Sequence, residues 1–65
     1  MSSIVTTKIV YQDDDFVKVE VVDDKGNVGS GTKLSRLFGF SKLSDEDIVE
    51  ATARAIRDVN KQRED

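Results

Sequence analysis

The chain has 65 residues, a formal net charge of −3, and neither cysteine nor histidine, which describes one small acidic domain, residues 1–65. Without His and Cys it lacks the commonest catalytic bases, thiol nucleophiles and zinc ligands, so we expect no enzyme, no cofactor and no bound metal. No apolar run is long enough for a membrane span and no signal-peptide pattern is present, so we expect a cytoplasmic protein.

The first half of the chain has the two-residue periodicity of β-strands. Residues 4–11 are rich in β-branched side chains, and residues 28–34 form a third, glycine-containing strand. Between them, residues 16–23 alternate apolar and polar side chains, as a half-buried strand does. The valines that share one face of this strand are Val17, Val19 and Val21. Short polar turns separate the three strands, which predicts an antiparallel meander.

The last third of the chain has helical periodicity, over residues 45–62. Ser44 is the expected N-cap, and Asp47 three residues later completes a capping box. The stripe expected to face the sheet is Ile48, Val49, Thr52, Ala55, Ile56 and Val59. We therefore predict an α+β fold of β-β-β-α order, in which one C-terminal amphipathic helix packs on one face of a three-stranded antiparallel sheet. Residues 63–65 are expected to be a frayed tail.

Residues 35–43 connect the third strand to the helix and contain several large apolar side chains around Gly39. One interpretation is a connecting loop or single helical turn whose Leu37, Phe38 and Leu43 close the open end of the core. The other is that Phe38 and Phe40 form an exposed recognition tip, because loops carry a large share of binding residues.

The stretch KGNVGSGTK, residues 25–33, has the glycines, hydroxyls and lysine of a phosphate-binding loop. The residue after Gly31 is Thr32 rather than lysine, and the flanks have strand patterns on both sides, so a Walker loop is not predicted. We expect a hairpin turn in which Gly26 or Asn27 takes a positive φ. The acidic clusters lie in turns and at the helix start, where carboxylates are normally solvated.

The basic side chains are unevenly placed. Residues 25–43 contain four bases and no acid, and the outer side of the helix adds three more. These bases are Lys25, Lys33, Arg36, Lys42, Arg54, Arg57 and Lys61. They form either part of a solvated mixed-sign surface or a patch that contacts nucleic acid.

Residues 19–33, VEVVDDKGNVGSGTK, and residues 48–61, IVEATARAIRDVNK, resemble the double-stranded-RNA-binding-like amino-terminal domain of a small-subunit ribosomal protein. That family has a valine-rich strand, a turn, the motif G-x-V-G-x-G and then a helix. The resemblance implies β-β-β-α order and RNA contacts at Gly29, Gly31 and Lys33. Where the family has a basic cluster near the helix start, this chain has three acids, which oppose phosphate binding.

Strand alternation leaves apolar side chains on the sheet face that the helix does not cover. With the two aromatic residues of the connection, they form the predicted protein interface: Ile4, Val10, Phe16, Val22, Phe38 and Phe40. Small acidic chains of this character resemble the regulators and inhibitors found among phage accessory genes, including anti-defence and anti-CRISPR proteins. We therefore predict a non-catalytic regulator or inhibitor that binds another protein or forms a homodimer. Nucleic-acid binding through residues 25–43 is the alternative.

Overall fold

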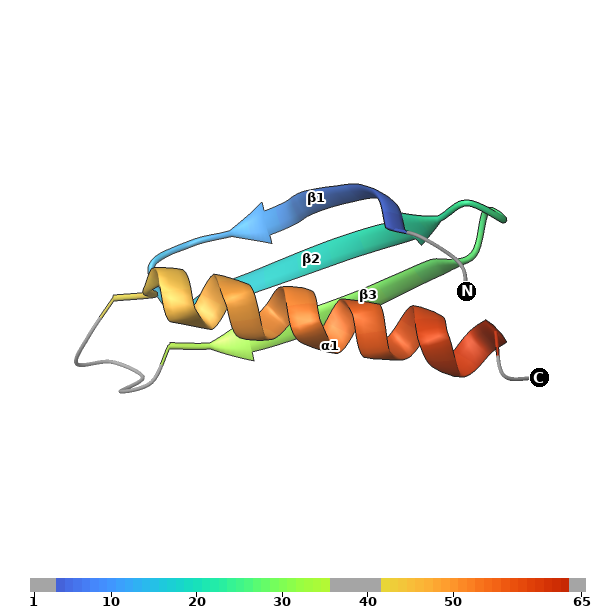
Figure 1. Ribbon diagram of the computed structural model, residues 1–65. Helices are drawn as coiled ribbons and strands as arrows, with labels where there is room; N and C mark the ends of the chain where they lie inside the picture. The colour runs from blue at the N-terminus through green and yellow to red at the C-terminus, as the bar shows by residue number, and fades with distance from the viewer. Residues whose placement is uncertain (1–3, 36–41, 64–65) are drawn as a thin grey trace.

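The computed structural model describes residues 4–35 and 42–63, which form a three-stranded sheet and one helix (Figure 1). The elements are β1 (Ile4–Gln12), β2 (Phe16–Asp23), β3 (Val28–Leu34) and α1 (Asp45–Arg63). The sheet is antiparallel with strand order β1-β2-β3. The predicted α+β meander with a C-terminal helix is confirmed, and each element ends within one residue of its predicted bound.

The hydrophobic core lies between α1 and one face of the sheet. Its fully buried side chains are Val17, Val19 and Val21 of β2 with Ala51, Ala55 and Val59 of α1. Around them pack the partly buried Ile4, Leu43, Ile48 and Ile56. The predicted direction of the three β2 valines is therefore confirmed. Leu43 also packs against the core as expected, whereas Leu37 and Phe38 lie outside the described residues.

Two glycines of β3 allow the helix to come close to the sheet. Gly29 and Gly31 lie opposite Val21 and Val19 in the register, so they face the helix, and both are buried. A Cβ atom on Gly31 would collide with the carbonyl oxygen of Ala51, and one on Gly29 would collide with backbone atoms of the next helical turn. The glycines of the KGNVGSGTK stretch therefore serve helix packing rather than a phosphate loop.

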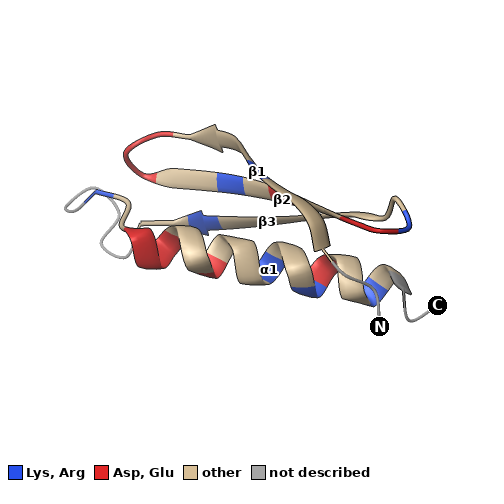
Figure 2. Cartoon of the chain, turned by 45° about the horizontal axis from the view of Figure 1, so that its top comes forward, with Lys and Arg blue, Asp and Glu red and all other residues tan. Residues whose placement is uncertain are grey.

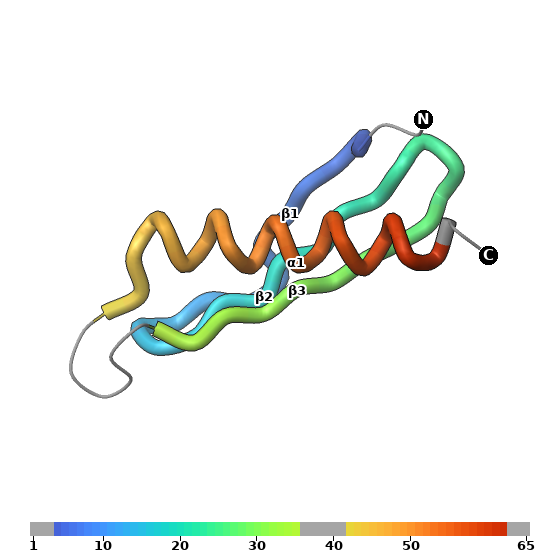
Figure 3. The backbone as a smooth tube through the Cα atoms, turned by 60° about the horizontal axis from the view of Figure 1, so that its bottom comes forward, coloured from blue at the N-terminus to red at the C-terminus, as the bar shows by residue number. Residues whose placement is uncertain are grey.

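The close approach places α1 to one side of the sheet. The helix packs extensively on β3 and β2, while β1 lies beyond it (Figures 1 and 3). Every residue of β1 except Ile4 is consequently exposed. Within residues 4–35 and 42–63, the helix thus covers the β3 side of the sheet and leaves the β1 side uncovered.

Aspartate side chains hold both hairpin turns. Between β2 and β3, Asp23 is buried and its Oδ1 accepts hydrogen bonds from the amides of Lys25 and Asn27. Gly26 in the same turn has a φ of 84°, the conformation that the sequence predicted for Gly26 or Asn27. Between β1 and β2, Asp13 Oδ1 accepts from the amides of Asp15 and Phe16. Both turns use the side-chain-to-backbone bonding that favours aspartate there.

Two face assignments made from the sequence are wrong. Val49 was expected in the buried stripe but is 67% exposed, and Ala51, which was not assigned to it, is fully buried. Where α1 lies against Gly29 and Gly31, there is room only for small helical side chains, so the buried stripe is centred on Ala51 and Ala55. Ile4 was expected on the uncovered face but packs against the core. A register shift between Ile4 and Thr6 inserts one extra residue, and one extra residue reverses the face of everything before it.

Substitution of Gly31 by alanine should destabilise the fold. The added methyl group meets backbone atoms of α1, which cannot move aside as a flexible side chain can. Overpacking of this kind costs about 1–3 kcal/mol in free energy of unfolding. Urea unfolding of Gly31→Ala measures the cost, with Ser30→Ala as the control because Ser30 is exposed on the same strand. Equal midpoints for the two variants would contradict the close approach of helix and strand.

Candidate functional site

The outer edge of β3 is covered by side chains from α1. Gln62 Nε2 donates to the carbonyl of Val28 at 2.7 Å, and Arg54 Nη1 donates to the carbonyl of Thr32 at 2.8 Å. Between them, Asp58 Oδ2 accepts from the amide of Ser30 at 3.0 Å. The three helical residues are four positions apart and so lie on one ridge of α1. They bond every second residue of β3, the residues whose peptide groups point away from β2.

The sheet face turned away from α1, called here the open face, has apolar side chains at both ends and polar ones between. At one end, Val22 lies opposite Val28, which is 45% exposed. The middle is polar, with Lys8 of β1 opposite Glu20 of β2. At the other end lies a cluster that we call the end patch: Tyr11, Phe16 and Leu34. No other described element covers the open face (Figure 1).

The end patch is aromatic, exposed and held in place. Tyr11 and Leu34 are each 51% exposed, and Leu34 lies opposite the half-buried Phe16 in the register. The rings of Tyr11 and Phe16 have centroids 5.9 Å apart and are tilted by 50°, a favourable aromatic arrangement. The hydroxyl of Tyr11 donates to Asp13 Oδ2 at 2.7 Å. This bond lowers the pKa of Asp13 and raises the pKa of Tyr11, since it favours the charged carboxylate and the neutral phenol.

The structure brings together only part of the interface predicted from the sequence. Phe16 and Val22 are on the open face and half-buried, and Val10 is 37% exposed at the second register shift of β1. Ile4 belongs to the core instead, and Phe38 and Phe40 lie outside the described residues. The prediction missed Tyr11 and Leu34. Leu34 could have been predicted, because it is an even number of residues from Ser30 and Thr32 and so lies on the same face of the sheet as they do.

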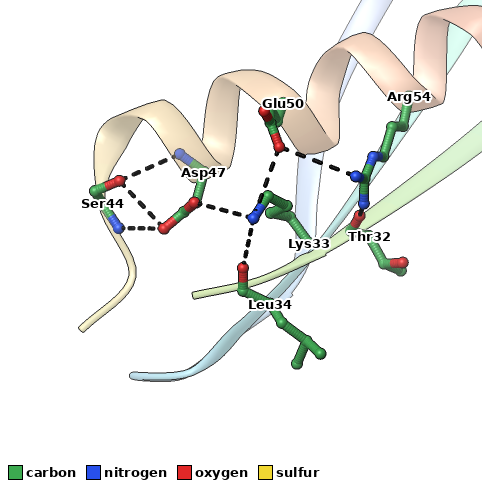
Figure 4. Close-up of polar contacts among 7 residues, drawn as sticks. All are labelled: Thr32, Lys33, Leu34, Ser44, Asp47, Glu50 and Arg54. Carbon is green, nitrogen blue, oxygen red and sulfur yellow. Dashed lines mark hydrogen bonds and ion pairs between the residues drawn. The ribbon is translucent and has the colours of Figure 1, made fainter. Parts of the chain in front are cut away.

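Lys33, a predicted RNA contact, is held by acids of the helix (Figure 4). Its ammonium lies 3.4 Å from Asp47 and 3.7 Å from Glu50, and it donates to the carbonyl of Leu34 at 2.9 Å. The side chain is only 19% exposed. Gly29 and Gly31, the other contacts that the ribosomal resemblance implies, are buried beneath α1. This part of the sheet therefore offers little positive surface to a phosphate.

The remaining predicted bases are divided between two regions. Lys25 and Lys42 are exposed in connections, and Arg36 lies outside the described residues. The helical bases gather beside the β3 edge, where they line an open groove of about 370 Å³. Its lining residues are Ser30, Arg54, Arg57, Asp58 and Lys61. In Figure 2 these bases follow the later turns of α1, whereas acids occupy its first turn.

The start of α1 has the predicted capping box (Figure 4). The amide of Asp47 donates to Ser44 Oγ at 3.3 Å, and the amide of Ser44 donates to Asp47 Oδ2 at 3.0 Å. The hydrogen bond from the Ser44 amide is the main cause of a lowered pKa at Asp47, and the neighbouring Lys33 lowers this pKa further. One carboxylate thus joins the helix start to β3.

The described residues contain no group of three His, Cys, Asp or Glu side chains placed to hold a metal ion. Within the same residues, no helix is long and apolar enough to cross a membrane. Comparison with protein-family models, curated proteins and solved structures finds no match for this chain.

Replacement of Asp47 by asparagine should lower stability at neutral pH and lose its effect in acid. The folded-state pKa of Asp47 is lowered from 3.8, so its stabilising contribution is complete above that value. The contribution disappears as the pH falls through the lowered folded pKa. Urea unfolding midpoints of the wild type and Asp47→Asn, measured from pH 7 down to about 2, should therefore converge.

Asp45→Asn is the matched control, because it removes a carboxylate from the same helical turn at an exposed position without a described hydrogen bond. It should shift the midpoint less than Asp47→Asn at pH 7. Equal shifts would mean that only the helix dipole is involved, and that the capping box and Lys33 contribute nothing.

Proposed function

We propose that this protein works by binding another protein, as a small regulator or inhibitor rather than as an enzyme. The observation that carries the proposal is the end patch, where Tyr11 and Leu34 are half exposed beside Phe16 on a face that no described element covers. Sheet faces that remain in water normally have polar side chains. Apolar side chains gathered there are typical of a contact surface.

The construction of the end patch supports this proposal. Tyrosine and phenylalanine give large contact areas with little loss of side-chain entropy, and aromatic residues are frequent among those that dominate binding energy. Asp13 holds the tyrosine hydroxyl, so the ring is positioned before a partner arrives. A positioned anchor pays less ordering entropy on binding.

The surroundings of the end patch indicate the chemistry of the partner. The turn beside it contributes three consecutive carboxylates, Asp13, Asp14 and Asp15. A complementary surface would have an apolar centre and a basic rim, because opposite charges at the rim steer association and select partners. Nucleic-acid-handling proteins commonly have such basic surfaces, which is consistent with the expected action of a phage-type inhibitor on a host complex of this kind.

A second candidate function is nucleic-acid binding at the helical groove. Arg54, Arg57 and Lys61 line it, and Arg57 and Lys61 have no described ion pair. The spacing of three and four residues places the bases along one side of the helix. Against this candidate, Arg54 is already bonded to Thr32 and lies 4.0 Å from Glu50, and Asp58 adds a carboxylate to the groove.

Leu34→Ser should weaken partner binding with little effect on folding. The side chain is half exposed, so its loss removes contact area rather than core packing. A residue near the centre of an interface contributes more than about 1 kcal/mol, equivalent to at least about a fivefold weaker affinity. The measurement is affinity capture with tagged protein from the organism that encodes it, followed by titration of the captured partner against both forms.

Val49→Ser is the control, because Val49 is 67% exposed on the helix and lies away from the end patch. Partners lost with Leu34→Ser and retained with Val49→Ser support the proposal. If both variants retain the same partners with the same affinity, the end patch is not the contact surface.

Nucleic-acid binding at the groove makes a separate prediction. Affinity for RNA or DNA should fall steeply with salt, and Arg57→Gln or Lys61→Gln should each reduce the slope of log affinity against log salt by about one unit. Lys25→Gln, in the turn between β2 and β3, should leave the slope unchanged. Fluorescence anisotropy with labelled oligonucleotides measures this slope. Absence of binding at about 50 mM salt would exclude the second candidate.

A further inference from the structure

The outer edge of β1 has peptide groups that no other strand of the described residues bonds. In an antiparallel sheet every second residue directs its N–H and C=O toward the same neighbour. The backbone amide of Ser30 and the carbonyl of Thr32 on β3 point away from β2, toward α1. When the pairing is followed from β3 across β2 to β1, the peptide groups of β1 that point away from β2 are those of Thr7 and Ile9. The side-chain hydrogen bonds found among the described residues reach the β3 edge and the turns, but neither Thr7 nor Ile9.

The two edges of the sheet therefore differ in whether their peptide groups are hydrogen-bonded. Three side chains of one helical ridge bond the β3 edge, which prevents another strand from adding there. β1 has nine residues and a single charge, Lys8, and apart from Tyr11 of the end patch it carries the exposed apolar side chains Val5, Ile9 and Val10. Natural edge strands that remain in water are usually short or charged. A long apolar edge strand, in a sheet whose opposite edge is protected, indicates that β1 has a partner strand.

The small size of the core indicates which partner this is. Among the described residues, the fully buried apolar side chains are four valines and two alanines, while larger ones on β1 remain exposed. Domains of this size with little core and no disulfide commonly gain stability by oligomerisation. A second copy of the chain is the partner that is present wherever the protein is made, and its β1 has the same open edge.

Symmetry and charge select one register for such a pair. In a twofold antiparallel pair the outward peptide groups must meet each other, so Thr7 lies opposite Thr7, Thr7 lies opposite Ile9, or Ile9 lies opposite Ile9. The third arrangement would place Thr7 opposite Tyr11, whose peptide groups face β2 because of the register shift between Ile9 and Tyr11, so few hydrogen bonds could form. The second arrangement places Lys8 directly opposite Lys8, and like charges in that position are unfavourable. The first places Lys8 opposite Thr6. The register centred on Thr7 is therefore favoured.

We propose that β1 pairs with β1 of a second copy around Thr7, which joins the two three-stranded sheets into one continuous antiparallel sheet. Both helices then lie on the same face, because the twofold axis is perpendicular to the sheet. Residues 50, 54 and 58 lie along the side of α1 above β3, so Ile48, Thr52 and Ile56 lie on the side toward the seam. Two of these, Ile48 and Ile56, are apolar and only partly buried in the single chain. This proposal is independent of the end patch.

The test is the oligomeric state of the full chain and of Thr7→Pro, measured by sedimentation velocity from about 1 to 500 μM, a range that covers ordinary homodimers. The wild type should sediment as a dimer. Proline removes an N–H that points away from β2, so the sheet of each monomer is retained while pairing of the edge is blocked. The dissociation constant should rise by at least about 100-fold with an unchanged circular dichroism spectrum. Ile9→Lys, which places a charge on the same edge, should act in the same way.

Cross-linking tests the register itself. The chain has no cysteine, so single-cysteine variants report one position each. Residues in a hydrogen-bonded antiparallel pair have Cα atoms about 5.5 Å apart, within the range that a disulfide spans. Thr7→Cys should form a covalent dimer on mild oxidation, and Thr32→Cys, on the protected β3 edge, should not.

Three outcomes would overturn the proposal: a monomeric wild type, a dimer that Thr7→Pro and Ile9→Lys both leave intact, or equal cross-linking at Thr7 and Thr32. Leu34→Ser serves as a further control and should remain dimeric. Loss of the dimer and loss of partner binding are thereby separated, because each is assigned to a different variant.

Discussion

The structure depends on the contact between the glycines of β3 and the alanines of α1. Gly29 and Gly31 remove the side chains that would separate the two backbones, and Ala51 and Ala55 fill the remaining space without pushing the helix outward. This contact fixes the helix above β3 and β2 and leaves β1 beyond it. The exposure of β1 is therefore a consequence of packing at the opposite edge.

The same contact determines which polar groups meet. With α1 held above β3, one helical ridge reaches the outer peptide groups of that strand, and Asp47 reaches Lys33. Lys33, which was expected to contact RNA, instead forms ion pairs with acids of α1. The bases of the helical groove lie in the later turns of α1, whereas the acidic turn of Asp13, Asp14 and Asp15 adjoins the end patch. The charge pattern thus separates two surfaces on a very small molecule.

The order and bounds of the elements could be predicted because their signals are local. The alternating valines of β2, the turn around Gly26 and the capping box at Ser44 each require only neighbouring residues. The face of Ile4 and the position of Tyr11 could not be predicted, since the two register shifts of β1 occur inside a stretch of uniformly β-prone residues. The ion pair of Lys33 depends on where the helix lies, which a sequence pattern does not specify.

The proposed pairing of β1 and the proposed binding at the end patch are compatible, and each would make the other more effective. The seam uses the edge of β1 around Thr7, whereas the end patch lies on the open face beside the turn after β1. In a twofold dimer both end patches lie on the same face of one continuous sheet. Two identical contacts on one rigid body bind a repeated or dimeric target with much greater avidity than one contact does. A chain with so small a core would then gain stability and binding strength from the same association.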